Sequence, residues 1–225
     1  MRTALGLVWT IAWKDLRCEL RAAGGIITMV LLGFLVVLVF SFCLESAARE
    51  SASARSGILW AAFLFPGLVA VGRSFEGEKE VQCLEGLLLC PVDRSLIYLG
   101  KLLSSTILCW GSGLVVLVFF TALYNVGLGW EWPALLGIML LLAAGLSAVG
   151  TLAAAVTVGV QARGALLSVL VLPLLVPLLV AAARCSVVLL GSEPWSGLGL
   201  WPVLMAIYDV VFVAVGIAIF EFVVE

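Results

Sequence analysis

The residues that could carry chemistry are few in this chain and gather in two places. A polar segment at residues 73–101, RSFEGEKEVQCLEGLLLCPVDRSLIYLGK, interrupts an otherwise apolar sequence. Arg184 and Asp209 are the ionisable residues that lie within long apolar stretches. The chain has no histidine, which removes the most common metal ligand and the usual general base at neutral pH. We therefore expect charge pairing and protein contacts here rather than catalysis.

The sequence also lacks the motifs that would indicate other catalytic, metal or nucleotide sites. The six cysteines are scattered without a C-x-x-C pair, so they indicate neither a metal site nor a disulfide framework. No G-x-x-x-x-G-K-[ST] phosphate loop is present, and no nucleophile is paired with a base. The net charge of -2 gives no reason to expect nucleic-acid binding. We predict no catalytic residue, no metal and no cofactor in this chain.

The polar segment combines glutamates with leucines at helical spacing. The glutamates are Glu76, Glu78, Glu80 and Glu85. Leu84, Leu87 and Leu88 follow at i, i+3 and i+4, and Pro91 stops any helix. This pattern predicts a short amphipathic helix, a proline break and a second helix that enters the membrane. The alternative is a solvated loop whose leucines lie against the membrane surface.

The elements that position these residues are membrane helices. Hydrophobic residues make up 64% of the 225-residue chain and charged residues 12%, with a mean hydropathy of +1.26, whereas soluble domains carry about 25% charged residues. We predict an all-α integral membrane protein, a single membrane domain over residues 1–225. Apolar segments long enough to span a bilayer occur at residues 26–44, 53–72, 102–124, 132–160, 165–190 and 200–224.

Residues 1–25 form a different kind of element. Apolar residues from Leu5 to Leu20 recur at helical spacing, while Lys14, Arg17 and Arg21 fall on another side. This predicts an amphipathic helix in the membrane interface. Because the charges follow the apolar stretch, we expect a retained N-terminus and not a cleaved signal peptide.

Basic residues predict the orientation, since Lys and Arg are retained on the cytoplasmic side. With the N-terminus inside, nine basic residues fall in inner segments and two, Arg49 and Arg55, in outer loops. Trp130, Trp132 and Trp201 fall at the outer boundary. We thus expect the protein in the cell inner membrane, with both termini and the polar segment on the cytoplasmic side. The Gly- and Pro-rich connection at residues 191–202 is compatible with a broken helix that re-enters the membrane.

Two features inside the membrane segments could serve function. Pro173 and Pro177, one turn apart, predict a bent fifth segment. This bend is either plain packing or a hinge. Arg184 and Asp209 both fall in the outer half of the bilayer, where ionisable residues are costly unless paired or hydrated. We favour a structural ion pair between them, with a polar contact to a substrate or partner as the alternative.

Several stretches resemble one family of export permeases. The run LEGLLLCPVDRS at residues 84–95, followed by Gly100-Lys101, resembles the loop after the second membrane helix of ABC-2-type permeases. LPLLVPL at residues 172–178, Arg163-Gly164, Lys14-Asp15-Leu16 and Glu19-Leu20-Arg21 are similar to the haem exporter protein B family of the cytochrome c maturation system. The resemblance covers essentially the whole chain.

The resemblance implies a permease subunit, of ABC-2-type fold, that works with a separate ABC ATPase subunit. In that case the ATPase binds ATP, the glutamates of the polar segment face its basic residues, and Leu84, Leu87 and Leu88 are apolar anchors beside Pro91. Haem is implied as a substrate, and other membrane subunits of cytochrome c maturation as partners. The alternatives are export of another amphiphile, such as a drug, lipid or glycan precursor, and a scaffold that remodels a complex without transport.

Overall fold

The computed structural model describes residues 4–21, 24–44, 51–73, 94–127, 129–156, 163–191 and 195–223, and these form helices without a strand. The helices are α1 (Ala4–Arg21), α2 (Gly24–Cys43), α4 (Ala52–Arg73), α7 (Arg94–Tyr124), α8 (Trp132–Val156), α9 (Arg163–Leu190), the short 3-10 helix η1 (Trp195–Leu198) and α10 (Trp201–Val223). Within this part of the chain, six helices, α2 to α10 without η1, are long and apolar enough to cross a membrane. The predicted all-α membrane fold with six spans is confirmed.

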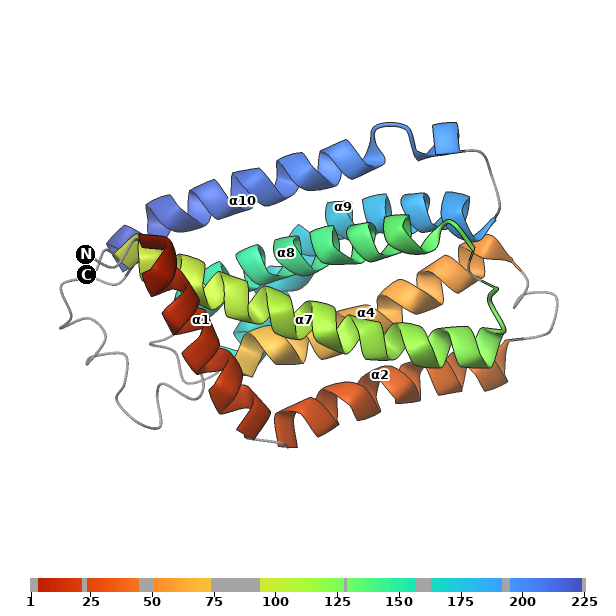
Figure 1. Ribbon diagram of the computed structural model, residues 1–225, viewed down its shortest axis with the longest axis horizontal. Helices are drawn as coiled ribbons and strands as arrows, with labels where there is room; N and C mark the ends of the chain where they lie inside the picture. The colour runs from red at the N-terminus through yellow and green to blue at the C-terminus, as the bar shows by residue number, and fades with distance from the viewer. Residues whose placement is uncertain are drawn as a thin grey trace.

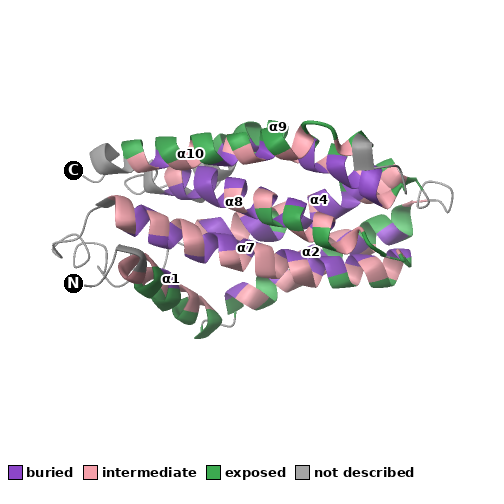
Figure 2. Ribbon diagram, turned by 45° about the horizontal axis from the view of Figure 1, so that its top comes forward, coloured by how far each residue is buried: buried purple, intermediate pink, exposed green. Residues whose placement is uncertain are grey.

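The six long helices lie side by side, and α1 crosses one end of them obliquely (Figure 1). The start of α1 and the end of α10 lie at this same end (Figure 1). Helix α8 packs against α4, α7, α9 and α10. Its spanning stretch is 67% buried, against 17% for α10. Helix α8 is therefore the centre of the bundle and α10 a peripheral helix, whose outer face is exposed (Figure 2).

Glycines permit the close approach of the helices around α8. A Cβ at Gly150 of α8 would overlap the side chain of Val71 in α4. A Cβ at Gly216 of α10 would likewise overlap the ring and hydroxyl of Tyr98 in α7. Within lipid, helices associate through such close packing because lipid tails are as apolar as leucine. Glycine at these positions therefore sets the distances between helices.

Buried hydrogen bonds add to the packing between α4 and α9. Ser56 donates from Oγ to the carbonyl oxygen of Ala183 at 2.9 Å. Trp60 donates from Nε1 to Oγ of Ser186, also at 2.9 Å. These bonds fix which face of α9 turns toward the bundle.

The helix ends follow local rules. Helix α7 ends where Asn125 adopts a φ of 46°, a conformation that asparagine tolerates after a helix. Pro133 and Pro202 stand in the first turns of α8 and α10, where a missing N–H costs no helical bond. Helix α7 begins at Arg94, in agreement with the expected second helix that follows the proline break and leads into the membrane segment at residues 102–124.

The glycine contacts lead to a prediction about stability. Gly150→Leu should lower the free energy of unfolding by about 1–3 kcal/mol, because the new side chain forces Val71 and α4 outward. Unfolding of the protein in mixed micelles titrated with SDS measures this change. Gly137→Leu is the matched control, since it lies on the same helix and a Cβ there meets nothing within 4 Å. Equal destabilisation by both substitutions would contradict the packing account.

Candidate functional site

The predicted coupling residues lie in the connection between α4 and α7, outside the described residues. They are Glu76, Glu78, Glu80, Leu84, Glu85, Leu87, Leu88 and Pro91. The structure does describe both flanks of this connection, because α4 ends at Arg73 and α7 begins at Arg94. Helix α1 packs on α7 and α2. The site is therefore built from these flanks and from α1.

The first flank is joined to α1 by an ion pair. Arg73, in the last turn of α4, donates a hydrogen bond from Nε to Oε1 of Glu19 in α1. The side chains are only 33% and 15% exposed. Gly25 of α2 provides space, because a Cβ there would overlap the guanidinium group and the carboxylate. A partly buried pair is screened by salt less than a fully exposed one, so this contact fixes the end of α4 to α1.

The second flank is joined to α1 by a buried lysine. Lys101, in α7, has a fully buried side chain, and its Nζ lies 3.7 Å from Oδ2 of Asp15 in α1. Oδ1 of Asp15 lies 3.0 Å from Nζ of Lys14. A buried ammonium group is very costly unless a carboxylate or hydrogen bonds compensate it. Gly100 allows the close approach, since a Cβ there would lie 2.8 Å from Cβ of Ile11.

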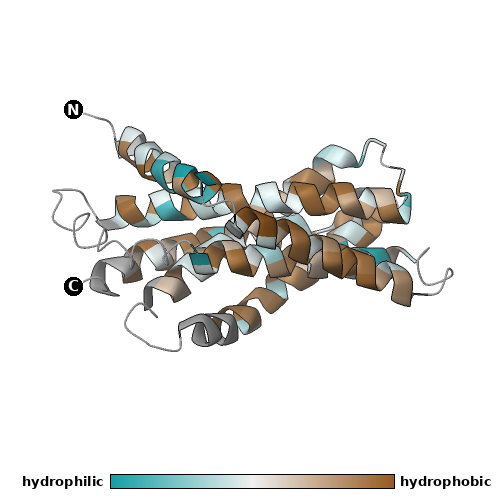
Figure 3. Ribbon diagram, turned by 90° about the horizontal axis from the view of Figure 1, so that it is seen from below, coloured by the Kyte–Doolittle hydropathy of each residue, from teal (hydrophilic) through white to brown (hydrophobic). Residues whose placement is uncertain are grey.

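One helix thus holds both flanks of the connection at residues 74–93. We call the four residues Asp15, Glu19, Arg73 and Lys101 the α1 clamp. Hydrophilic residues are concentrated on α1, whereas the middle of the bundle is hydrophobic (Figure 3). Asp15 and Glu19 are four residues apart and so share one face of α1. Sequence reasoning assigned no role to these two acids, although their i, i+4 spacing was a signal that could have found them.

The two prolines of α9 lie beside α10. Pro173 and Pro177 are both exposed, and α9 continues through them. Tyr208 of α10 donates from its hydroxyl to the carbonyl oxygen of Leu174 at 2.6 Å. This acceptor belongs to the turn between the prolines, so α10 is bonded directly to the part of α9 that the sequence marks as a hinge. The hinge itself stays a prediction.

The predicted ion pair between Arg184 and Asp209 is wrong for this structure. Arg184 is exposed on α9, whereas Asp209 of α10 is 8% exposed. Both carboxylate oxygens of Asp209 are buried without a hydrogen-bond partner in the described structure. Oδ1 lies 2.5 Å from where a Cβ of Gly145 would stand. Helix α10 is turned so that Asp209 faces α8, whereas the side chain of Arg184 is exposed.

The fold and the α1 clamp define an α-helical membrane protein in which an N-terminal helix is anchored to both flanks of one connection. Within this class, the chain belongs to the CcmB protein family, whose model matches residues 6–223. It is 33% identical to the Heme exporter protein B of Rhodobacter capsulatus over 174 residues, which are 76% of this chain and 78% of that protein. It is 30% identical to the Heme exporter protein B of Escherichia coli K12 over 176 residues, 78% of this chain and 80% of that protein.

The α1 clamp predicts how α1 responds to charge changes. Arg73→Glu should weaken its docking because two carboxylates then face each other, and adding Glu19→Arg should restore the docking by exchanging the charges. Hydrogen–deuterium exchange of the backbone amide groups of α1, followed by mass spectrometry, reports the docking.

Arg17→Gln serves as the control for this experiment, since Arg17 lies on the exposed face of α1. Exchange of the α1 amide groups that stays at the wild-type level in Arg73→Glu would show that the pair does not hold α1.

Proposed function

We propose that this chain is the membrane subunit of a haem exporter that is driven by a separate ATPase subunit. The observation that carries the proposal is the family match over residues 6–223, with relatives named Heme exporter protein B that the chain covers over most of their length. The sequence has no phosphate loop, so ATP binds to the partner subunit. The chain itself contributes the membrane helices and the surface on which the ATPase docks.

The α1 clamp supports a coupling role for the connection at residues 74–93. In this proposal Glu76, Glu78, Glu80 and Glu85 face basic residues of the ATPase, while Leu84, Leu87 and Leu88 are apolar anchors beside Pro91. A few buried anchors usually dominate such an interface. Because Arg73 and Lys101 are both joined to α1, a displacement of the connection acts on α4, α7 and α1 together.

The proposed orientation places the end of the bundle that carries α1 on the cytoplasmic side of a cell inner membrane. The start of α1, the end of α10 and both flanks of the connection belong to one end of the bundle (Figure 1). Nine of the basic residues fall in segments assigned to this side and two in loops of the other side. Retention of Lys and Arg on the cytoplasmic side supports cytoplasmic termini.

In this proposal, ATP hydrolysis drives either delivery of haem across the membrane or release of a haem-loaded chaperone on its outer side. The chain acts together with other membrane subunits of cytochrome c maturation. Co-reconstitution of the complex in vesicles tests this. ATP hydrolysis should rise when haem is supplied, and haem or the loaded chaperone should leave the complex only in the presence of ATP. Hydrolysis stimulated equally by an unrelated drug or lipid would favour export of another amphiphile.

The docking proposal predicts loss of the ATPase from the purified complex. Glu85→Arg combined with Leu88→Asp should reduce co-purification at least about tenfold, because the change replaces an anchor and inverts a charge at the centre of the interface. The amount of ATPase recovered in mild detergent measures this. Trp130→Asp with Glu131→Arg makes matched changes at the other end of the bundle, where Trp130 is 89% exposed, and should leave recovery unchanged. Wild-type recovery with the first variant would rule out docking at this segment.

The hinge proposal predicts a change in the rate of ATP-driven turnover and no change in assembly with the ATPase. Pro173→Ala with Pro177→Ala should straighten α9 by restoring backbone hydrogen bonds and should slow ATP-driven turnover several-fold, while the ATPase still co-purifies. Turnover in vesicles is the measurement. Pro133→Ala, in the first turn of α8, is the control. If turnover is unchanged in the α9 variant, the prolines serve only the packing of a bent helix.

A further inference from the structure

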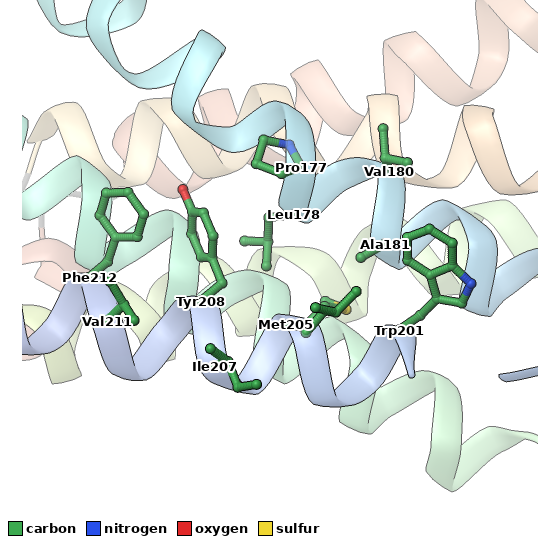
Figure 4. Close-up of a pocket in the computed structure, with 11 residues that line it drawn as sticks. Pro177, Leu178, Val180, Ala181, Trp201, Met205, Ile207, Tyr208, Val211 and Phe212 are labelled. Atoms are coloured by element: carbon green, nitrogen blue, oxygen red, sulfur yellow. The ribbon is translucent and has the colours of Figure 1, made fainter. Parts of the chain in front are cut away.

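A groove of about 490 Å³ lies between α9 and α10. Its α9 wall includes Val180 and Ala181 (Figure 4). Its α10 wall carries three aromatic rings, those of Trp201, Tyr208 and Phe212. This volume falls in the range of pockets for small molecules, about 300–1,000 Å³. Because Val180 is exposed, the groove opens to the outside of the bundle.

The groove offers apolar and aromatic surface along its length. The hydroxyl of Tyr208 already donates to the carbonyl oxygen of Leu174, and the ring of Tyr208 lies 4.4 Å from that of Phe212, measured between centroids. The indole of Trp201, at the start of α10, lies at the other end, next to Ala181 (Figure 4). A ligand in this groove must therefore be apolar along its body, and flat if it is to stack on the rings.

Arg184 follows on α9 at the Trp201 end of the groove. It follows Ala181 by three residues and Val180 by four, so helical periodicity places it on the groove side of α9, one turn nearer the outer end. Its side chain is exposed, and no carboxylate of the described residues lies within ion-pair distance of it. An arginine on the outer surface of a spanning helix is costly unless it meets water or an anion. That end of the groove thus has a guanidinium group with no acidic partner among the described residues.

We infer that the α9–α10 groove binds a porphyrin through its ring, with the porphyrin carboxylates on Arg184. The groove supplies aromatic faces for a flat apolar macrocycle, and the guanidinium fork matches the geometry of a carboxylate. An acyl chain would not stack on the flat faces of these rings. This inference rests on the proposed function for the identity of the cargo, and it assigns the site and the contacts within this chain.

The test compares porphyrins that differ only in their charge. Metal-free protoporphyrin IX and its dimethyl ester are titrated against the purified full-length protein in nanodiscs, and binding is followed by quenching of tryptophan fluorescence. Arg184→Gln should weaken binding of the free acid about tenfold or more, through loss of a charge-assisted contact, and should leave binding of the ester unchanged. Ala181→Phe, which fills the groove, should weaken binding of both. Arg17→Gln, at the other end of the bundle, is the matched control.

Three results would overturn the inference. The acid and the ester could lose affinity equally in Arg184→Gln, or Ala181→Phe, shown to be folded by its unchanged melting temperature, could bind both normally. Oleic acid could also displace the porphyrin with the same dependence on Arg184, which would make this an acyl-chain site. Haem delivery to c-type cytochromes in cells tests the proposed function separately. Saturable porphyrin binding without any role in delivery would retain the site and remove the function.

Discussion

The bundle depends on how closely its helices can approach α8. Lipid tails compete with leucine and valine for apolar surfaces, so burial of such side chains alone holds membrane helices together weakly. Gly150 and Gly145 remove side chains where α4, α9 and α10 meet α8. The backbones then come near enough for dispersion contacts to accumulate. The position of every other group described above, including the buried carboxylate of Asp209, follows from these distances.

Helices α1 and α10 are held to the bundle around α8 by different kinds of interaction, and each forms one edge of the molecule. At one end, α1 is held to the bundle by ion pairs and by the packing of Ile11 on Gly100. Along one side, α10 packs chiefly on α8 and less closely on α9 and α7, and it leaves a groove toward α9, which is crossed by the bond from Tyr208 to Leu174. Charge thus governs the edge at α1, and a single hydrogen bond with aromatic packing governs the edge between α9 and α10. Motion at the two edges can differ without any change at α8.

Sequence reasoning recovered the spans because length and hydropathy are properties of each segment alone. It also recovered the helix that follows the proline break and enters the membrane, but nothing in the local pattern shows that Lys101 is buried beside α1. The Arg184–Asp209 pair failed for a related reason. Depth in the membrane can be counted from residue numbers, but the rotation of α10 toward α8 depends on glycine contacts between distant segments. The acidic run and its leucines lie outside the described residues, so their role as a docking surface stays a prediction.

The burial of Lys101 has a consequence for biogenesis. A lysine in a membrane segment costs about 2.5–3.5 kcal/mol at the helix centre during insertion, and less near the ends. The ribosome completes α1 before α7, so Asp15 is already at the membrane surface when Lys101 arrives. A carboxylate waiting there offsets part of this cost while α7 enters the bilayer. The order of the helices along the chain therefore makes the N-terminal helix an internal insertion partner for a span that is synthesised later.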